Sequence, residues 1–164
     1  MFSCGQANKF MNGTRNKPAA REPENSLQEK KTMALNRMNP DGMYMPNKGI
    51  YSQVVTSTGK TTVHVAGTVP FDEDANVVGL GDMKAQTFQI LANLRISLEA
   101  AGAQPANVVR INVYTLNADD YVANGAPEVI AFFGDNKPCS TTVQVSRLVH
   151  PDWLVEIEAT AVID

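Results

Sequence analysis

The chain has 164 residues, of which 43% are hydrophobic, so its length suits one domain with a buried core. The formal net charge of -3 leaves no excess of lysine and arginine to neutralise a phosphate backbone, which argues against a nucleic-acid partner. With 2 cysteines and 2 histidines we expect neither a disulfide framework nor a metal site, and a reducing, cytoplasmic location is favoured.

The first 48 residues are predicted to form an extension before a domain over residues 49–164. Residues 1–32 are rich in Asn, Lys, Glu, Pro and Gly and have no helical or strand periodicity, which is typical of a disordered tail. Their acidic residues argue against a mitochondrial presequence. No apolar run approaches the roughly 20 residues that cross a bilayer, so we expect no membrane partner.

The first half of the domain is predicted to contain a hairpin and a long helix. The β-branched runs 50–57 and 61–67 are separated by a Thr-Gly-Lys turn, which is typical of a β-hairpin. After a loop, Asp82 is a good N-cap for a helix that extends to Gly102, with apolar residues along one stripe.

The second half alternates between strands and a helix. Side chains of residues 108–116 alternate in character as they do in a strand. Asn117 can cap a second helix, and Gly125 and Pro127 are expected to break this helix so that it restarts. Two alternating runs predict the final strands: 141–148 and 153–163. The predicted order is β-β-α-β-α-β-β.

The predicted sheet has more surface than its helices can cover, because two helices can pack on only one face. In the 108–116 strand, alternation places Val109, Ile111 and Val113 on one side. The opposite side then carries these apolar residues: Val108, Tyr114 and Leu116. A half-apolar uncovered face predicts that the chains associate with one another.

Three polar features have a simple structural interpretation. Cys139 follows a proline with neither histidine nearby in sequence, so a structural or pocket-lining role is favoured over a nucleophile. The Gly-Leu-Gly stretch at 79–81 departs from GxGxxG at Lys84 and predicts a loop and helix cap. His64 lies on a strand and is predicted to be a partly buried, hydrogen-bonded side chain.

Glu156 and Glu158 are predicted to lie on the same side of the last strand, about 6.6 to 6.8 Å apart along it. If that side is partly buried, at least one of the two carboxylates has a role beyond solubility. A solvated edge that carries two acids is the alternative, and the sequence leaves both open.

Several separated motifs resemble the Rid family, also called YjgF or L-PSP endoribonuclease-like. They are, in order, GIYSQVV, VAGTVPFD, LEAAGAQPANVV, PCSTTVQVSRL and LVEIEATAV, between about Gly49 and Ile163. The resemblance implies an α+β, chorismate-mutase-like fold of the bacillus type, with a mixed sheet and two helices on one face. It also implies a homotrimer with ligand pockets at the subunit interfaces, hydrolysis of enamines and imines such as 2-aminoacrylate, and no cofactor.

The same resemblance assigns roles to individual residues. Tyr51 and Glu156 are the predicted catalytic residues, with Tyr51 lining the pocket and Glu156 holding the attacking water or the departing nitrogen. The predicted substrate-binding residues are Gly67, Thr68, Ser140, Thr141 and Thr142, and the backbone around Gly67 and Thr142 offers amide donors.

This sequence departs from the deaminating members at Ser140, where they carry an arginine that binds the substrate carboxylate. That charged, bidentate pair contributes about 1.5 to 3 kcal/mol to the interaction with the substrate carboxylate. Its loss therefore predicts that an anionic substrate is bound and turned over about 10- to 150-fold less effectively. Strand parity places Arg147 on the face opposite to Ser140, which leaves Lys137 as the better replacement. Ala66 also replaces a family serine. The pocket is therefore predicted to prefer a neutral or cationic ligand.

Three functions follow from these features. An enamine or imine hydrolase acting on a small reactive metabolite, with an altered substrate preference, is favoured. A non-catalytic trimeric protein that binds a small molecule is the alternative, and it predicts ligand-induced stabilisation without product. An endoribonuclease is least favoured, because the chain lacks an excess of basic residues for RNA.

Overall fold

The computed structural model describes residues 34–41 and 51–164. In chain order the elements are β1 (Ala34–Met38), β2 (Val54–Thr58), β3 (Thr61–Thr68), α1 (Met83–Ala100), η2 (Pro105–Asn107), β4 (Val108–Thr115), α2 (Ala118–Asp120), η3 (Tyr121–Gly125), α3 (Ala126–Phe133), β5 (Cys139–Gln144) and β6 (Val155–Ile163). From β2 onward the predicted order is confirmed. The tail predicted over residues 1–32 lies outside the described residues.

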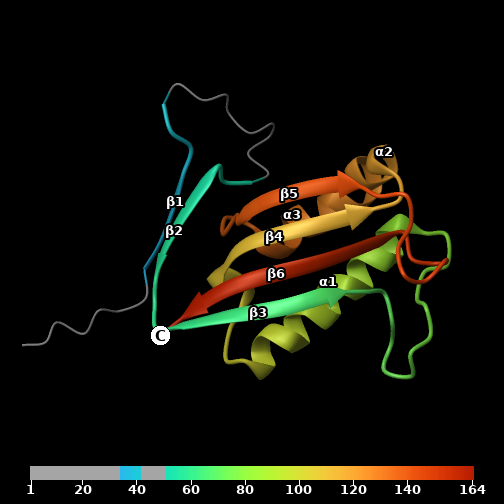
Figure 1. Ribbon diagram of the computed structural model, residues 1–164, viewed down its shortest axis with the longest axis horizontal. Coiled ribbons are helices and arrows are strands. Elements are labelled where there is room, and N and C mark those ends of the chain that lie inside the picture. The colour runs from blue at the N-terminus through green and yellow to red at the C-terminus, as the bar shows by residue number, and fades with distance from the viewer. Residues whose placement is uncertain (1–33, 42–50) are drawn as a thin grey trace, which may run out of the picture.

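A four-stranded sheet in the order β3-β6-β4-β5 forms the centre of the fold. β6 runs antiparallel to both β3 and β4, whereas β4 and β5 are parallel, so the sheet is mixed as predicted. Helices α1 and α3 lie behind this sheet in Figure 1, on one of its faces. The described residues leave the opposite face uncovered, and none of the helices among them is long and apolar enough to span a bilayer.

The predicted hairpin between residues 50–57 and 61–67 is wrong. β2 pairs antiparallel with β1, and the two form a separate ribbon that rises at a steep angle from the start of β3 (Figure 1). The chain turns at Gly59, whose backbone approaches β6 so closely that a Cβ would lie 2.6 Å from Cγ1 of Val162. Lys60 then donates its backbone N–H to Ile163 O at 3.0 Å, so β3 starts as a partner of β6.

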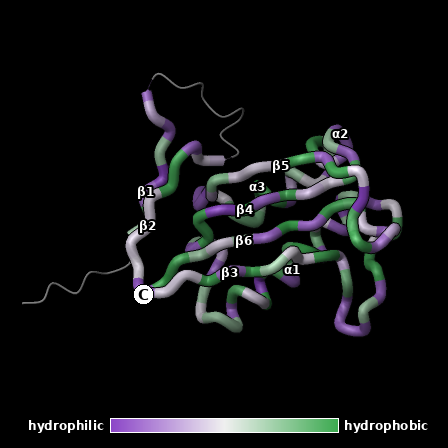
Figure 2. The backbone as a smooth tube through the Cα atoms, in the orientation of Figure 1, coloured by the Kyte–Doolittle hydropathy of each residue, from purple (hydrophilic) through white to green (hydrophobic). Residues whose placement is uncertain are grey.

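The hydrophobic core lies between the sheet and the helices. The expected stripe of α1 supplies Leu91, Leu94 and Leu98, which are buried, and Ile90 beside it is buried as well. Asp82 caps this helix by accepting a hydrogen bond from Ala85 N at 3.0 Å, so the preceding Gly-Leu-Gly stretch is the predicted loop and cap. Hydrophobic and hydrophilic residues alternate along β6 in Figure 2, which matches one core face and one uncovered face.

The uncovered face is more polar than predicted. A bulge between Val108 and Arg110 shifts the register of β4, so Val108 is buried in the core and not on this face. Asn112 and Tyr114 occupy the uncovered face, and both donate hydrogen bonds to Glu158 Oε1, at 2.5 and 3.1 Å. A polar network therefore replaces the expected half-apolar surface.

The second helix breaks where the sequence predicted. Asn117 caps α2 by accepting from Asp120 N at 3.0 Å, and a π-helical turn, η3, then ends at Gly125 before α3 begins. β5 covers Cys139–Gln144 and ends earlier than predicted, because its partner β4 ends at Thr115 and offers no further ladder. These corrections leave the order of the elements unchanged.

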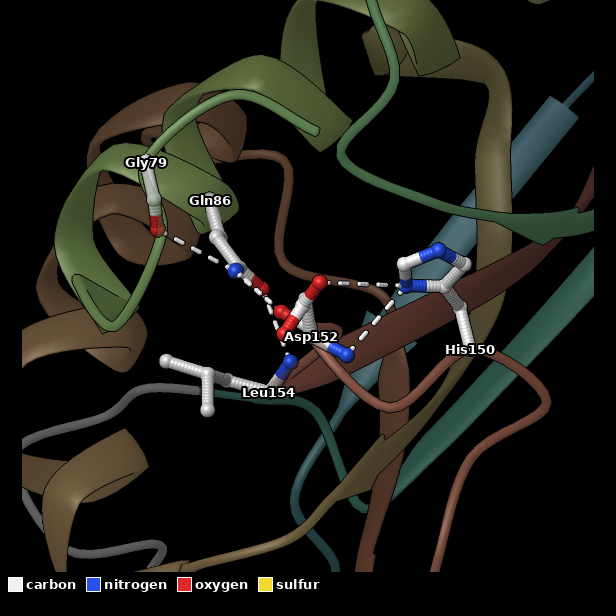
Figure 3. Close-up of polar contacts among 5 residues, drawn as sticks. All are labelled: Gly79, Gln86, His150, Asp152 and Leu154. Atoms are coloured by element: carbon white, nitrogen blue, oxygen red, sulfur yellow. Dashed lines mark hydrogen bonds and ion pairs between the residues drawn. The ribbon is translucent and has the colours of Figure 1, made fainter. Parts of the chain in front are cut away.

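A buried glutamine holds the long connection between β5 and β6. Gln86 on α1 has 0% exposure, and its Nε2 donates to Gly79 O at 3.1 Å and to Asp152 O at 2.8 Å. Its Oε1 accepts from Leu154 N at 2.8 Å (Figure 3). One side chain therefore joins the loop before α1 to the start of β6.

Candidate functional site

A cavity of about 430 Å³ lies between β5 and the η3–α3 segment, and we call it the tyrosine cavity. Its polar lining residues are Tyr51, Tyr121, Lys137, Ser140 and Thr142. Apolar side chains of β4 and α3 complete its wall, including Ile111, Val129, Ile130 and Phe133. Three predicted site residues, Tyr51, Ser140 and Thr142, are therefore brought together.

Strand pairing explains why these residues meet. In the parallel ladder Ser140 lies opposite Ile111 and Thr142 opposite Val113, and both of these β4 residues face the core. The segment with Tyr51 is held beside β5 by its neighbour Ser52, whose N–H donates to Pro138 O at 3.2 Å and whose Oγ donates to Lys137 O at 2.8 Å.

Tyr121 is a cavity residue that the sequence predictions missed. Its side chain is only 5% exposed, and burial raises its pKa to about 12 although a hydrogen bond with Thr142 acts in the opposite direction. Tyr121 opens the π-helical turn, and such turns are frequent at functional sites. The break predicted at Gly125 and Pro127 was the only available signal for it.

Glu156 lines a different cavity, of about 410 Å³, on the uncovered face of the sheet. We call this the glutamate cavity, and its other lining residues are Tyr114, Val145, Arg147, Leu148, Val149 and Glu158. Arg147 lies beyond the end of β5, so the parity argument does not apply to it, and it lines the glutamate cavity and not the tyrosine cavity. Burial raises the pKa of Glu156, and the negative charge of Glu158 raises it further.

Gly67 shapes the surroundings of Glu156. The β3–β6 ladder is irregular between Val65 and Thr68, and a Cβ added to Gly67 in this bulge would overlap Oε1 of Glu156. Thr68 is nearly buried and donates its Oγ1 to Ala66 O at 3.1 Å. The glycine is therefore required for the carboxylate to lie against the bulged strand.

The predicted site residues thus form two groups in one chain. Tyr51, Ser140 and Thr142 lie in the tyrosine cavity, whereas Gly67 and Glu156 meet away from it. Thr141 lines neither cavity and so belongs to neither group. Its Oγ1 accepts a hydrogen bond from Arg110 Nη2 at 3.4 Å. We call the two groups half-sites.

The remaining polar candidates lie apart from both half-sites. Cys139 is half-buried and its Sγ donates to Gln53 O at 3.7 Å, a contact that fits the structural interpretation. His64 is exposed on β3, so the prediction of a partly buried histidine is wrong. Within residues 34–41 and 51–164, no group of three or more His, Cys, Asp or Glu side chains could hold a metal ion.

The raised pKa of Glu156 predicts a pH-dependent stability. The folded protein binds this proton more tightly than the unfolded chain, so the stabilisation is full below pH 4.5 and is lost as the pH rises through the higher folded-state pKa. Relative to wild type, Glu156→Gln should therefore gain thermal stability as the pH rises from below that value to neutral. Melting temperatures across this range check it, with the exposed Glu99→Gln as the charge-matched control. A difference that stays constant with pH would contradict the prediction.

The comparisons with known proteins agree on one family. Residues 45–163 match the family model described as Endoribonuclease L-PSP. The RutC family protein PH0854 of Pyrococcus horikoshii is 39% identical over 114 residues, which cover 69% of this chain and 86% of that protein. The RutC family protein PYRAB12510 of Pyrococcus abyssi is 38% identical with the same coverage.

Solved structures give the same result. The Rid-family protein YyfB of Yersinia pestis superposes with a TM-score of 0.73 at 36% identity, over 79% of this chain and 98% of that one. A putative endoribonuclease, TM0215, of Thermotoga maritima has a TM-score of 0.60 at 33% identity, over 70% and 87% of the two chains. The resemblance of the sequence motifs is confirmed, and the chain belongs to the Rid family, also known as the YjgF or L-PSP family.

Proposed function

We propose that this protein is a cytoplasmic hydrolase that converts the imine or enamine form of a small metabolite into a carbonyl compound and ammonia. The observation that carries the proposal is the carboxyl group of Glu156, which is half-buried against Gly67 and has a raised pKa. A carboxyl group whose pKa lies closer to neutral pH can both accept and return a proton, as general acid–base catalysis requires.

The proposed reaction needs three proton movements. Glu156 takes a proton from a water molecule while the oxygen of that water bonds to the carbon of the protonated imine. The protonated carboxyl then returns this proton to the nitrogen, which becomes an ammonium leaving group. As the C–N bond breaks and ammonia leaves, the C=O bond forms, and the carboxylate accepts the hydroxyl proton and passes it to the ammonia. An enamine first takes up a proton at carbon to become the imine. No cofactor takes part in this scheme.

Assembly of chains would complete the site. The two half-sites lie apart in one chain, and the family resemblance implies interface pockets in a homotrimer. We propose that the tyrosine cavity of one subunit faces the Glu156 half-site of a neighbour. Tyr51 and the hydroxyl groups of Ser140 and Thr142 would then orient the substrate, and Glu156 would activate water. Gly67, Thr68 and Thr141 remain proposed substrate-binding residues on the same grounds.

The altered substrate preference is tested by restoring the arginine. Ser140→Arg is expected to raise kcat/KM for 2-aminoacrylate by about 10- to 150-fold, because a guanidinium can pair with the carboxylate through two charged hydrogen bonds. An imine without a carboxylate should show no such gain. Ser140→Gln, a polar variant without charge, is the control. Equal gains with both substrates would contradict the assigned preference.

Turnover by the purified full-length protein tests the function itself. We expect faster loss of imine absorbance and stoichiometric release of ammonia, measured over a panel of imines with and without a carboxylate. A binding protein without activity is the second candidate, favoured by Ser140 in place of the family arginine. It predicts a ligand-induced rise in melting temperature with no ammonia. Endoribonuclease activity is the least supported candidate, because the net charge is -3.

A further inference from the structure

The polar lining of the tyrosine cavity consists of hydrogen-bond donors. Its side chains are the ammonium of Lys137 and the hydroxyl groups of Tyr51, Tyr121, Ser140 and Thr142, with no carboxylate or side-chain amide among the lining residues. The rest of the wall is apolar, with Ile111 behind and α3 alongside. Such a lining is complementary to an apolar molecule that carries a hydrogen-bond acceptor.

Tyr121 is the most firmly positioned of these donors. Its ring packs on Gly125, where an added Cβ would lie 2.6 Å from the Cδ2 atom of the ring. The π-helical turn is closed by the N–H of Ala126, which donates to the carbonyl of Tyr121 itself. The hydroxyl is hydrogen-bonded to Thr142, and its pKa of about 12 keeps it protonated at neutral pH. Its orientation is therefore set before a ligand arrives.

We propose that Tyr121 determines ligand specificity: its hydroxyl, positioned by the hydrogen bond with Thr142, donates to a carbonyl oxygen on a ligand whose aromatic or branched apolar body fills the tyrosine cavity. The volume of about 430 Å³ is within the range of small-molecule pockets and accommodates a ring-sized body. The inference rests on the proposed function, because it names the substrate class of the same site as carbonyl-bearing, apolar imines.

Binding of three unreactive compounds tests this assignment. Toluene, benzamide and benzoate share an aromatic ring and differ in the group attached to it. Toluene has no polar group, benzamide has a neutral carbonyl group, and benzoate has a carboxylate. Ligand-detected NMR titration of the full-length protein is expected to show tighter binding of benzamide than of toluene. Tyr121→Phe should weaken benzamide binding by about 2- to 12-fold, the loss of one net hydrogen bond, and leave toluene unchanged. Thr61→Val, which removes an exposed hydroxyl at the start of β3 away from both cavities, is the control and should change neither.

Several results would overturn the assignment. These are unchanged benzamide affinity in Tyr121→Phe, an equal loss for toluene, or no saturable binding of benzamide to the wild type. Tighter binding of benzoate than of benzamide, with the difference lost in Lys137→Met, would make the head group a carboxylate and also overturn it. Thr142→Val provides a second test of the same hydroxyl pair if Tyr121→Phe does not fold. The three compounds are not hydrolysed, so their binding is measured independently of turnover. Tyr121-dependent binding of benzamide, combined with no ammonia release from the panel of imines, would count against the proposed reaction alone.

Discussion

Replacing Glu156 with glutamine is expected to lower imine hydrolysis by about 100- to 10,000-fold at neutral pH, the range of general acid–base catalysis. Glutamine has nearly the same shape as glutamate and still fits beside Gly67, but its amide cannot take a proton from water or return one to nitrogen. The loss should appear in kcat, whereas binding of an unreactive ligand in the tyrosine cavity should stay close to that of the wild type. Steady-state ammonia release and ligand titration measure the two effects separately.

Glu158→Gln is the matched control for this variant. Glu158 is two residues away on the same strand and lines the same cavity, but its Oε1 already accepts hydrogen bonds from Asn112 and Tyr114. Its replacement is expected to reduce turnover far less than that of Glu156. Equal losses in the two variants would indicate disturbance of the uncovered face instead of lost proton transfer. Unchanged turnover in Glu156→Gln would remove Glu156 from the mechanism.

Replacing the fully buried Gln86 with leucine is expected to lower the free energy of unfolding by about 2 to 4 kcal/mol, because the partly buried Leu154 N–H and Asp152 carbonyl lose their partner. Leucine approximates the volume of glutamine but makes none of its hydrogen bonds. Urea unfolding measures the change. Trp153, the only tryptophan of the chain, lies between the two freed groups in sequence and reports on this region by its fluorescence.

Gln144→Leu separates this effect from the loss of any glutamine. Gln144 is exposed and accepts one hydrogen bond, from Ala118 N at 3.0 Å, so its replacement is expected to cost less than about 1 kcal/mol. If both variants lose the same stability, the buried position of Gln86 has no special importance. The connection held by Gln86 also contains Arg147 and Leu148 of the glutamate cavity, so Glu156-dependent turnover should fall in Gln86→Leu before the fold is lost.

Short-range sequence patterns were sufficient to predict a structural feature where all the residues that form it lie in one segment. The cap at Asp82 and the apolar stripe of α1 could be predicted because the participating residues lie within a few turns of one helix. The break near Gly125 could be predicted for the same reason, although not the π-helical turn that buries Tyr121. The partner of β2 could not, because β1 and β3 are both strands of suitable sequence and length.

The candidate site shows the same division. The resemblance groups Ser140, Thr141 and Thr142 as substrate-binding residues, but side chains alternate along a strand, and the ladder with β4 places Thr141 on the face opposite to the other two. The separation of Tyr51 from Glu156 could not be predicted from such a local pattern. It depends on which face of the sheet the helices cover and on where the chain before β2 lies, and neither is encoded in a short window.

The sequence by itself determined the order of the elements from β2 onward, the helix caps and the family, because propensity, periodicity and motif spacing are properties of residues near one another in the chain. Only the tertiary structure decided that β2 leaves the main sheet, that a bulge buries Val108, and that the expected site residues form two half-sites. Strand partners, bulges and sheet faces arise from contacts between segments that are distant in sequence, where several pairings satisfy the same local pattern.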